Sequence, residues 1–250
     1  METEWKYDEL ATAYLNRPDY AEEAISGVLD MVGANTRDVC VADVGAGVAH
    51  LTLHLARRKL RVIAIEPSDA MRQIGIERTK SFQNVVWQEG TGEETGLASD
   101  SCDLVTFGSS FNVTDRPKSL SESHRLLKKG GALIVMWNHR DLMDEIQRGV
   151  ENIIKAEVPD YDYGSRREDQ TRVIAESGLF QNPVKVESSV NHRQNVSEVV
   201  TAWRSHATLQ RQAGDRFDNL IYLIEKFLRS GGREFIDTPY TTRIWVAKCK

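Results

Sequence analysis

The feature that most constrains the fold is an apolar run at residues 39–44 that ends directly in a glycine-rich turn. The run reads VCVADV and is followed by Gly45, Ala46 and Gly47. A continuous apolar run of this kind is typical of a strand buried on both faces of a parallel sheet. Glycines after such a strand allow a tight turn and the close approach of a ligand, because they carry no Cβ. The segment therefore predicts a strand, a ligand-binding turn and a helix that begins near His50.

The rest of the first half repeats this alternation of short apolar strands and helices. We expect further strands at residues 61–65, 84–88, 102–107 and 132–137. We expect helices at residues 5–17, 20–32, 50–58, 69–78 and 117–127. Strands that alternate with helices over short connections predict a Rossmann-like, doubly wound α/β sheet that is mostly parallel.

Beyond residue 138 the alternation changes. We expect helices at residues 142–158, 171–177, 197–212 and 216–228, and strands at residues 184–192 and 243–248. Two late strands with helices inserted between them predict a seven-stranded sheet with an antiparallel edge strand and a helical lid. We expect one domain over residues 1–250. Its parts are an N-terminal helical cap (1–33), a cofactor-binding core (38–137), and substrate-side helices with terminal strands (138–250).

Composition narrows the classes of protein. The 250 residues are 40% hydrophobic and 28% charged, as in ordinary globular chains. The net charge of −5 gives no electrostatic reason to expect a nucleic-acid partner. No apolar run approaches the ~20 residues that span a bilayer, so we expect a cytoplasmic protein without a membrane partner, as a monomer or homodimer. The cysteines are few and widely spaced, which predicts no metal site.

The turn after residue 44 fits one nucleotide cofactor better than another. A dinucleotide turn has the pattern G-x-G-x-x-G, but His50 stands where the third glycine would be. Asp43 would sit poorly beside a pyrophosphate and suits an ammonium group. Glu66 at the end of the next strand can accept both hydroxyls of a ribose. Its other interpretation is an acid that caps the helix near Asp69. Together these residues favour S-adenosylmethionine over NAD.

Several motifs resemble those of class I S-adenosylmethionine-dependent methyltransferases. Residues 43–49 resemble the glycine-rich first motif, D-x-G-x-G-x-G, with Ala49 in place of the last glycine. Residues 66–71 (EPSDAM) are similar to the ribose-binding acid and following helix, and residues 89–93 (EGTGE) to the loop beside the adenine. Residues 101–106 and 126–131 resemble the fourth strand and the turn before the fifth. The resemblance covers residues 5–137, and the motifs follow the order of the family.

The N-terminal segment resembles the small-molecule branch of that class. Residues 7–11 (YDELA) and Tyr14 carry this resemblance, and residues 200–205 are loosely similar to a late helix of the same branch. The branch includes enzymes similar to trans-aconitate and quinone-pathway methyltransferases. The resemblance implies a set of cofactor-binding residues: Tyr14, Asp43, Gly45, Ala46, Gly47, Glu66, Pro67, Met71, Gly92, Glu93 and Gly108.

Substrate contacts are expected from polar and aromatic residues near the carboxyl ends of the strands, where open α/β sheets bind ligands. These candidates are Tyr7, Phe111, Asn112, Trp137, Trp203 and His206. We expect His139, after the fifth strand, to be the general base, because its ordinary pKa lies near neutrality. The plainer alternative for His139 is a histidine that only stabilises a loop. For Trp203 the plainer alternative is a core position.

The predicted function is transfer of a methyl group from S-adenosylmethionine to an oxygen or nitrogen atom of a small metabolite. The aromatic candidates suggest an aromatic or heterocyclic acceptor from secondary metabolism. Displacement at a sulfonium methyl needs alignment above all, and a base only if the nucleophile must lose a proton. Three alternatives stay open. The chain could methylate protein or nucleic acid, it could bind the cofactor without catalysis, or its acceptor could be a carboxylate held by Arg140 or Arg204.

Overall fold

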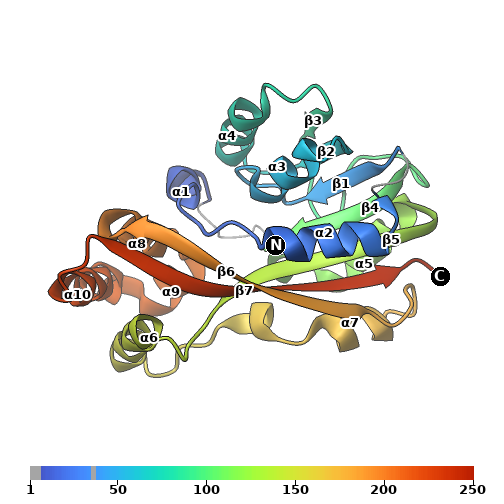
Figure 1. Ribbon diagram of the computed structural model, residues 1–250. Helices are drawn as coiled ribbons and strands as arrows, with labels where there is room; N and C mark the ends of the chain where they lie inside the picture. Colours follow the sequence, from blue (N-terminus) through green and yellow to red (C-terminus); the bar gives the residue numbers. More distant parts are fainter. Residues whose placement is uncertain (1–6, 35–37) are drawn as a thin grey trace.

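A seven-stranded sheet in the order β3-β2-β1-β4-β5-β7-β6 organises the computed structural model, which describes residues 7–34 and 38–250 (Figure 1). The strands are β1 Cys40–Val44, β2 Arg61–Ile65, β3 Val85–Gln88, β4 Cys102–Gly108, β5 Leu127–Arg140, β6 Val184–Asn195 and β7 Phe235–Lys248. The pairs among β1 to β5 are parallel, and β7 runs antiparallel to both β5 and β6. The predicted Rossmann-like sheet with an antiparallel edge is confirmed.

Helices cover both faces of the sheet and extend past one end of it. They are α1 Tyr7–Tyr14, α2 Glu22–Met31, α3 His50–Arg57, α4 Asp69–Thr79, α5 Arg116–Leu126, α6 Glu145–Glu157, α7 Gln170–Glu176, α8 Val196–Arg204, α9 Ala207–Ala213 and α10 Phe217–Ser230. Short 3-10 turns are η2 Phe111–Val113, η3 Gly164–Arg167 and η4 Gly214–Arg216. Apolar residues of α2 and α3 pack on one sheet face, and those of α5 and α7 pack on the other.

Strand β1 is buried at every position because it lies in the middle of the sheet. Its side chains alternate between the two faces. Val41 belongs to the apolar cluster under α2 and α3, whereas Ala42 and Val44 belong to the cluster under α5 and α7. Strand order reverses between β1 and β4, so the turns that leave these two strands diverge. A crevice at the carboxyl ends of the strands follows from this topology.

A third apolar cluster is built from α6, α8, α9 and α10 at one end of the sheet (Figure 1). The sequence predicts a single helix over residues 197–212, but the structure has α8 and α9 with a break at Ser205. The side chain of Arg17 stabilises the chain at this break. Its Nη2 donates to the carbonyl oxygen of Ser205 at 2.6 Å, and its Nε donates to the hydroxyl oxygen of Ser205 at 3.0 Å. A side chain 188 positions away therefore satisfies the carbonyl oxygen at the buried end of α8.

Two strands are longer than the sequence predicts. β5 starts at Leu127 and continues to Arg140, so the predicted turn at residues 128–131 lies within the strand, where the pairing with β4 shifts register. β7 starts at Phe235 because its first half pairs with β6. The predicted start of the first helix at Trp5 lies outside the described residues. Among residues 7–34 and 38–250, no helix has both the length and the apolar character needed to cross a membrane.

Candidate functional site

The glycine turn after β1 has the backbone shape that its sequence predicts. Gly45 and Gly47 have φ angles of +67° and +56°, which L side chains rarely adopt. A Cβ on Gly45 would lie 2.4 Å from the Cβ of Ser110, so only glycine fits there. The amides of Gly45 and Ala46 donate to the carbonyl oxygen of Ile65 at 2.8 and 3.0 Å. The turn is thus held against the end of β2 by these two amides. Because both already donate to Ile65, a ligand would contact the surface of the turn and not these N–H groups.

Glu66 stands at the end of β2 and locks onto the same turn. Its Oε2 accepts from the amide of Gly47 at 2.8 Å, and its Oε1 accepts from the amide of Ser68 at 2.9 Å. Burial raises the pKa of this carboxyl, although the two amide hydrogen bonds act to lower it. The capping residue of α4 is Ser68, whose hydroxyl accepts from the amide of Met71. Glu66 is therefore not the helix cap, and it lines the cavity described below.

Asp43 is a fully buried carboxyl that joins β1 to its neighbours. Its Oδ2 accepts from the hydroxyl of Thr52 on α3 at 2.7 Å, and its Oδ1 from the hydroxyl of Thr106 on β4 at 2.9 Å. Burial raises its pKa to about 6, and the two hydroxyl bonds reduce that effect. Each oxygen retains a lone pair for another donor. The contact with an ammonium group remains a prediction, since threonines already engage both oxygens.

A cavity of about 690 Å³ opens at the carboxyl ends of the strands. That volume is within the usual range for small-molecule sites. All of the predicted cofactor-side residues line it: Tyr14, Asp43, Gly45, Ala46, Gly47, Glu66, Pro67, Met71, Gly92, Glu93 and Gly108. The structure thus brings together residues from α1, from three strand ends and from the loop after β3.

The loop after β3 is also held in place by a carboxylate. Glu93 accepts from the amide of Asp115 at 2.6 Å, which ties the loop to the start of α5. A Cβ on Gly92 would lie 2.6 Å from Thr114, so a larger residue would push the loop from this position. These contacts hold the loop in place on the side of the cavity that is predicted to border the adenine.

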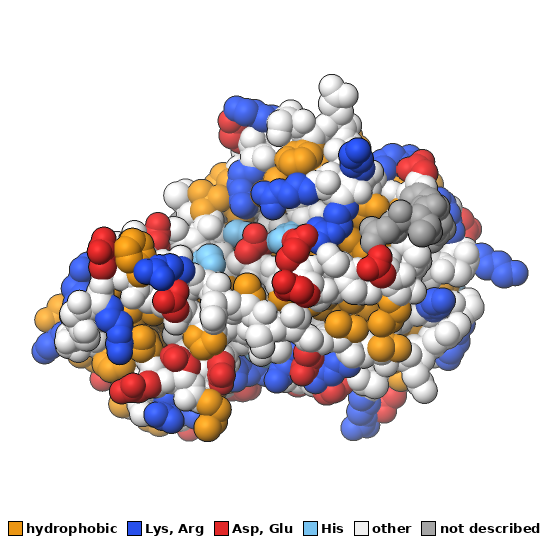
Figure 2. Space-filling view, viewed as in Figure 1, with side chains coloured by type: hydrophobic (Ala, Val, Ile, Leu, Met, Phe, Trp, Pro, Cys, Tyr) orange, Lys and Arg blue, Asp and Glu red, His pale blue; other side chains and the backbone are white. Residues whose placement is uncertain are grey.

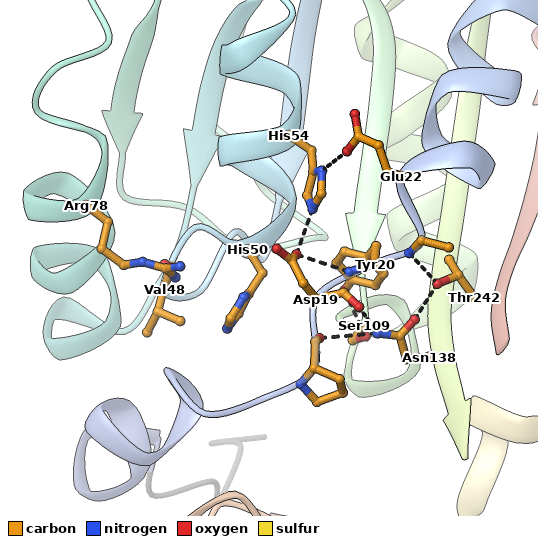
Figure 3. Close-up of polar contacts among 12 residues, drawn as sticks. Asp19, Tyr20, Glu22, Val48, His50, His54, Arg78, Ser109, Asn138 and Thr242 are labelled. Carbon is orange, nitrogen blue, oxygen red and sulfur yellow. Dashed lines mark hydrogen bonds and ion pairs between the residues drawn. The ribbon is translucent and has the colours of Figure 1, made fainter. Parts of the chain in front are cut away.

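The strap, residues 18–22, consists of the segment that leads into α2 and of Glu22, the first residue of α2 (Figure 3). Pro18 and Tyr20 of the strap line this crevice. His54 on α3 lies between two carboxylates of the strap, with Nε2 2.7 Å from Asp19 and Nδ1 2.8 Å from Glu22. The hydroxyl of Tyr20 is 3.0 Å from that of Ser109. Asn138 on β5 donates to the carbonyl oxygen of Asp19 at 2.8 Å. The strap is therefore attached to α3, β4 and β5.

His50 attaches α1 to the same face. Its Nε2 lies 3.0 Å from the carbonyl oxygen of Tyr14, which can only accept a hydrogen bond. Burial lowers the pKa of His50 to about 4, so the ring is neutral near pH 7 and donates from Nε2. The residue that departs from the dinucleotide pattern is thus a link between α3 and the N-terminal cap. Sequence analysis identified the departure but not this role.

The substrate-side candidates divide into those that line the cavity and those that do not. Five of them line it: Asn112, Trp137, His139, Trp203 and His206. The expectation for Phe111 is wrong, because its ring is fully buried and packs edge-on against Phe107 at 5.3 Å in the core under α5. The backbone of Tyr7 begins α1, but its side chain lies outside the described part of the chain.

His139 and Trp137 lie within β5 rather than after it. The predicted loop position for His139 is wrong, because β5 continues to Arg140 and pairs His139 with Thr241 of β7. Residues two apart on a strand share a face, which places both side chains toward the cavity. The indole of Trp137 donates to the amide oxygen of Asn112 at 2.8 Å. His139 is 6% exposed, and its role as a base stays a prediction.

The far wall of the cavity contains residues that sequence analysis did not select. Tyr163 and Arg167 come from the polar, aromatic loop after α6, and Arg17 comes from the end of α1. Of the two arginines considered for a carboxylate, Arg140 lines the cavity. Arg204 instead pairs with Asp218 at 3.1 Å, and both of these side chains are exposed. The predicted alternative of Arg204 as a cavity residue is therefore wrong.

The chemistry of the strand-end wall fits S-adenosylmethionine. Its carboxylates Asp43, Glu66 and Glu93 would complement a cofactor that carries a sulfonium, an ammonium group and two ribose hydroxyls. A Cβ on Gly47 would meet only the sulfur of Met71, at 3.9 Å, so the space beside this turn is open. The strand order, the glycine turn and the acid at the end of β2 define the class I S-adenosylmethionine-dependent methyltransferase fold.

Comparison with known proteins agrees with this class. Residues 42–135 match the family described as "Methyltransferase domain". This part of the chain is therefore similar to methyltransferases, in agreement with the class that the fold indicates. The chain is 34% identical over 125 residues to an uncharacterized methyltransferase of Mycobacterium tuberculosis, covering 50% of this chain and 48% of that protein. It is 31% identical over 108 residues to a ubiquinone/menaquinone biosynthesis C-methyltransferase of Campylobacter jejuni, covering 40% and 45%.

Solved structures share the fold at low sequence identity. The YcgJ protein of Bacillus subtilis has a TM-score of 0.55 and 16% identity, over 88% of this chain and 97% of that chain. Phosphoethanolamine N-methyltransferase 2 of Haemonchus contortus, in complex with S-adenosylmethionine, has a TM-score of 0.55 and 16% identity, over 97% and 57%. This chain spans about half the length of the curated relatives it matches.

Proposed function

We propose that this protein transfers a methyl group from S-adenosylmethionine to an oxygen or nitrogen atom of a small aromatic or heterocyclic metabolite. The observation that supports this best is a single cavity with two unlike walls. Carboxylates and the glycine turn form one wall, and aromatic side chains with His139 form the other. A cofactor and a flat acceptor are the pair of ligands that such walls suit.

Each wall has a separate task in this proposal. Glu66 accepts hydrogen bonds from the ribose hydroxyls, and Gly92 with Glu93 borders the adenine. The bound cofactor supplies a methyl group that is already activated by its sulfonium. The chain must then hold the acceptor in line and exclude water, a task to which the strap and Trp137 contribute as parts of the cavity lining. His139 takes the proton from an acceptor that must lose one.

The size and charge of the site favour a small molecule over a polymer. The lining is shared among the strap, α1, α8 and the strand ends, so the cavity is covered from several sides. Acidic and basic side chains are interspersed over the face of the molecule in Figure 2, without the large basic area that a nucleic acid requires. The balance of charge, −5 in total, points the same way.

A second candidate reaction is methylation of carbon on a quinone precursor. It is favoured by the similarity to the biosynthetic C-methyltransferase of Campylobacter jejuni, which covers 40% of this chain. Such an acceptor is also flat and aromatic, and it needs a base to develop a nucleophilic carbon. The two candidates differ in the atom that receives the methyl group. The position of the new methyl in an isolated product separates them.

Calorimetry of S-adenosylmethionine and S-adenosylhomocysteine with wild type and Glu66→Ala tests the cofactor part. Loss of hydrogen bonds to a charged acceptor costs about 1.5–3 kcal/mol, so we expect the affinity to fall about 10-fold or more. Glu89→Ala is the matched control, because Glu89 directly follows β3 as Glu66 follows β2, is 76% exposed and lies outside the cavity lining. Absence of binding to wild type would contradict the proposal. Release of S-adenosylhomocysteine in the presence of candidate acceptors then tests turnover.

A further inference from the structure

The carboxylates and the guanidinium groups that line the cavity come from different elements, and Arg17 after α1 is a third arginine of the lining. The carboxylates Asp43, Glu66 and Glu93 stand at the strand-end wall around the glycine turn. At the opposite wall, between β5 and the turn η3, stand Arg140 and Arg167. Among the described residues that line this second wall, none is aspartate or glutamate. The first wall complements a cationic cofactor, and the second wall offers positive charge to whatever binds beside it.

Arg140 is a buried guanidinium with few close partners. Its side chain is 7% exposed and lies flat over the ring of Trp203, 4.4 Å from its centroid. Its polar neighbours are distant: Gln147 at 3.4 Å, the hydroxyl of Tyr163 at 3.5 Å and Glu151 at 3.6 Å. Good N–H···O bonds are 2.7–3.2 Å long. Arg140 therefore has donors that a ligand can engage more closely than the protein does.

The carboxylate nearest to Arg140 does not neutralise this wall. Glu151 is shared with Lys155 at 3.3 Å and with the hydroxyl of Tyr163, and it lies behind the cavity lining. One carboxylate thus faces two cationic side chains before Arg167 is counted. The net charge beside the cavity at this wall is positive.

Arg167 adds a second guanidinium at the same wall. Its guanidinium carbon stacks on the ring of Tyr163, 3.8 Å from the centroid. No ion pair with a carboxylate is found for it within the described part of the chain. Burial lowers the pKa of Arg167 and the neighbouring charge of Arg140 acts in the same direction, whereas Tyr163 and Glu151 act to raise it. Two like charges held together in a half-buried site favour an anion between them.

We infer that the wall formed by Arg140 and Arg167 binds a carboxylate or phosphate group of the methyl acceptor, beside the aromatic rings of Trp203 and Tyr163. Guanidinium groups bind such oxyanions through paired N–H donors, and stacked rings fix the plane of the guanidinium. The inference rests on the proposed function, because it names the class of acceptor for that reaction. It makes the acceptor a flat anion rather than a neutral heterocycle.

Titrations of the full chain saturated with S-adenosylhomocysteine test this inference. The probes are benzoate, phenyl phosphate and the neutral analogue benzamide, and calorimetry measures the affinity of the chain for each. We expect an anion to bind at least about 10-fold more tightly than benzamide, since charge-assisted hydrogen bonds are lost with the neutral probe. The tighter of benzoate and phenyl phosphate identifies the anionic group as carboxylate or phosphate.

Arg167→Gln is the decisive variant, because Arg167 has no described ion pair on which folding depends. We expect it to weaken binding of the anion about 10-fold or more and to leave the affinity for S-adenosylhomocysteine unchanged. Arg140→Lys, which keeps the charge opposite Glu151 but removes the planar fork, is expected to weaken the same probe. Arg204→Gln is the control, since Arg204 is an exposed arginine of α8 paired with Asp218 outside the cavity.

The inference would be overturned by equal binding of benzamide and both anions, by wild-type affinity for the anions in Arg167→Gln, or by no anion binding at millimolar concentration. A parallel loss of S-adenosylhomocysteine affinity in Arg167→Gln would also overturn it, because the arginine would then hold the carboxylate of the cofactor. If wild type binds the anions but not S-adenosylhomocysteine, the proposed function fails while the anion site stands.

Discussion

Asp43 shows how one buried carboxyl connects the fold to ligand charge. Its pKa of about 6 means that, without a ligand, it gains a proton as the pH falls through that value. A cation bound beside it favours the ionised form. We therefore expect the affinity for S-adenosylmethionine to rise as the pH increases toward about 6 and to level off above it. The rise is at most about tenfold per pH unit for one proton.

Calorimetry between about pH 5 and pH 7.5 measures this dependence. Glu66 also has a raised pKa, so wild type alone does not identify the group. Asp43→Asn keeps the shape: its amide oxygen can accept from one of the two threonines, and its NH2 group can donate to the hydroxyl of the other. We expect it to flatten the profile. An unchanged profile in Asp43→Asn would mean that another group releases the proton.

Ala49 occupies the place of the last glycine of the motif and retains its backbone shape. Its φ of 72° and ψ of 29° are left-handed, and its side chain is fully buried. For Ala49→Gly we expect unfolding free energy within about 1 kcal/mol of wild type, because relief of strain offsets the added chain entropy. Ala49→Val should destabilise by about 2 kcal/mol or more through strain and overpacking. Chemical denaturation measures both, and equal values for the two variants would contradict this reasoning.

The residues near the glycine turn could be predicted because their positions depend on local chain geometry. A residue directly after a parallel strand lies at the edge of the sheet where the crevice forms. Glu66, which directly follows β2, is an example. Phe111 follows a strand too, but the short turn η2 directs its ring into the core. Arg167 could not be assigned from sequence, because its place depends on where a loop remote from the turn packs.

At the scale of elements, the N-terminal strap is stabilised by charge. Glu22 of the strap contacts both His54 and Arg58. The next residue, Glu23, is exposed on the first turn of α2 and provides a matched control. We expect Glu22→Gln to lower the unfolding free energy by about 1 kcal/mol, since Glu22 is itself largely exposed. Glu23→Gln should change it by less than about 0.5 kcal/mol.

Hydrogen exchange of the strap tests whether this loss is local. Residues 18–24 should exchange faster in Glu22→Gln than in Glu23→Gln, while β1 and β4 exchange as in wild type. Binding of S-adenosylmethionine should weaken in parallel, because Pro18 and Tyr20 line the cavity. Equal exchange in the two variants would show that the hydrogen bonds donated by Asn138 and accepted by Thr242 hold the strap without this charge.

Element lengths were predictable only where the apolar pattern sets them. Central strands such as β1 and β2 are close to their predicted bounds, because burial on both faces demands apolar residues throughout. β5 and β7 extend through polar positions, such as His139 and Thr241, that pair with each other beyond the central core. Pairing with a partner remote in sequence, rather than residue preference, determines those ends.

At the scale of the whole molecule, composition says little about the charge of the site. The chain carries a net charge of −5, yet one wall of its cavity presents Arg140 and Arg167. The packing of η3 beside β5 brings these two arginines to one wall. The net charge of the sequence does not reveal this local excess of positive charge. In the proposed function, the carboxylates of the cofactor wall precede β5, whereas most residues of the acceptor wall come from β5 onward.

This division predicts that damage to the helical group affects the acceptor wall first. Ile224 of α10 is fully buried among residues of α6 and α8. Ile224→Ala should cost about 2–5 kcal/mol of local stability through lost burial and the cavity left behind. We expect faster hydrogen exchange in α6, α8 and α10, and little change in β1 to β4. The affinity for S-adenosylhomocysteine should stay within about twofold of wild type, a change of roughly 0.4 kcal/mol.

Val105→Ala in β4, also fully buried, is the reciprocal variant, for which we expect faster exchange across the sheet. If Ile224→Ala instead accelerates exchange in β1 and β4 as much as in α10, the two walls unfold as one cooperative unit and the division is wrong.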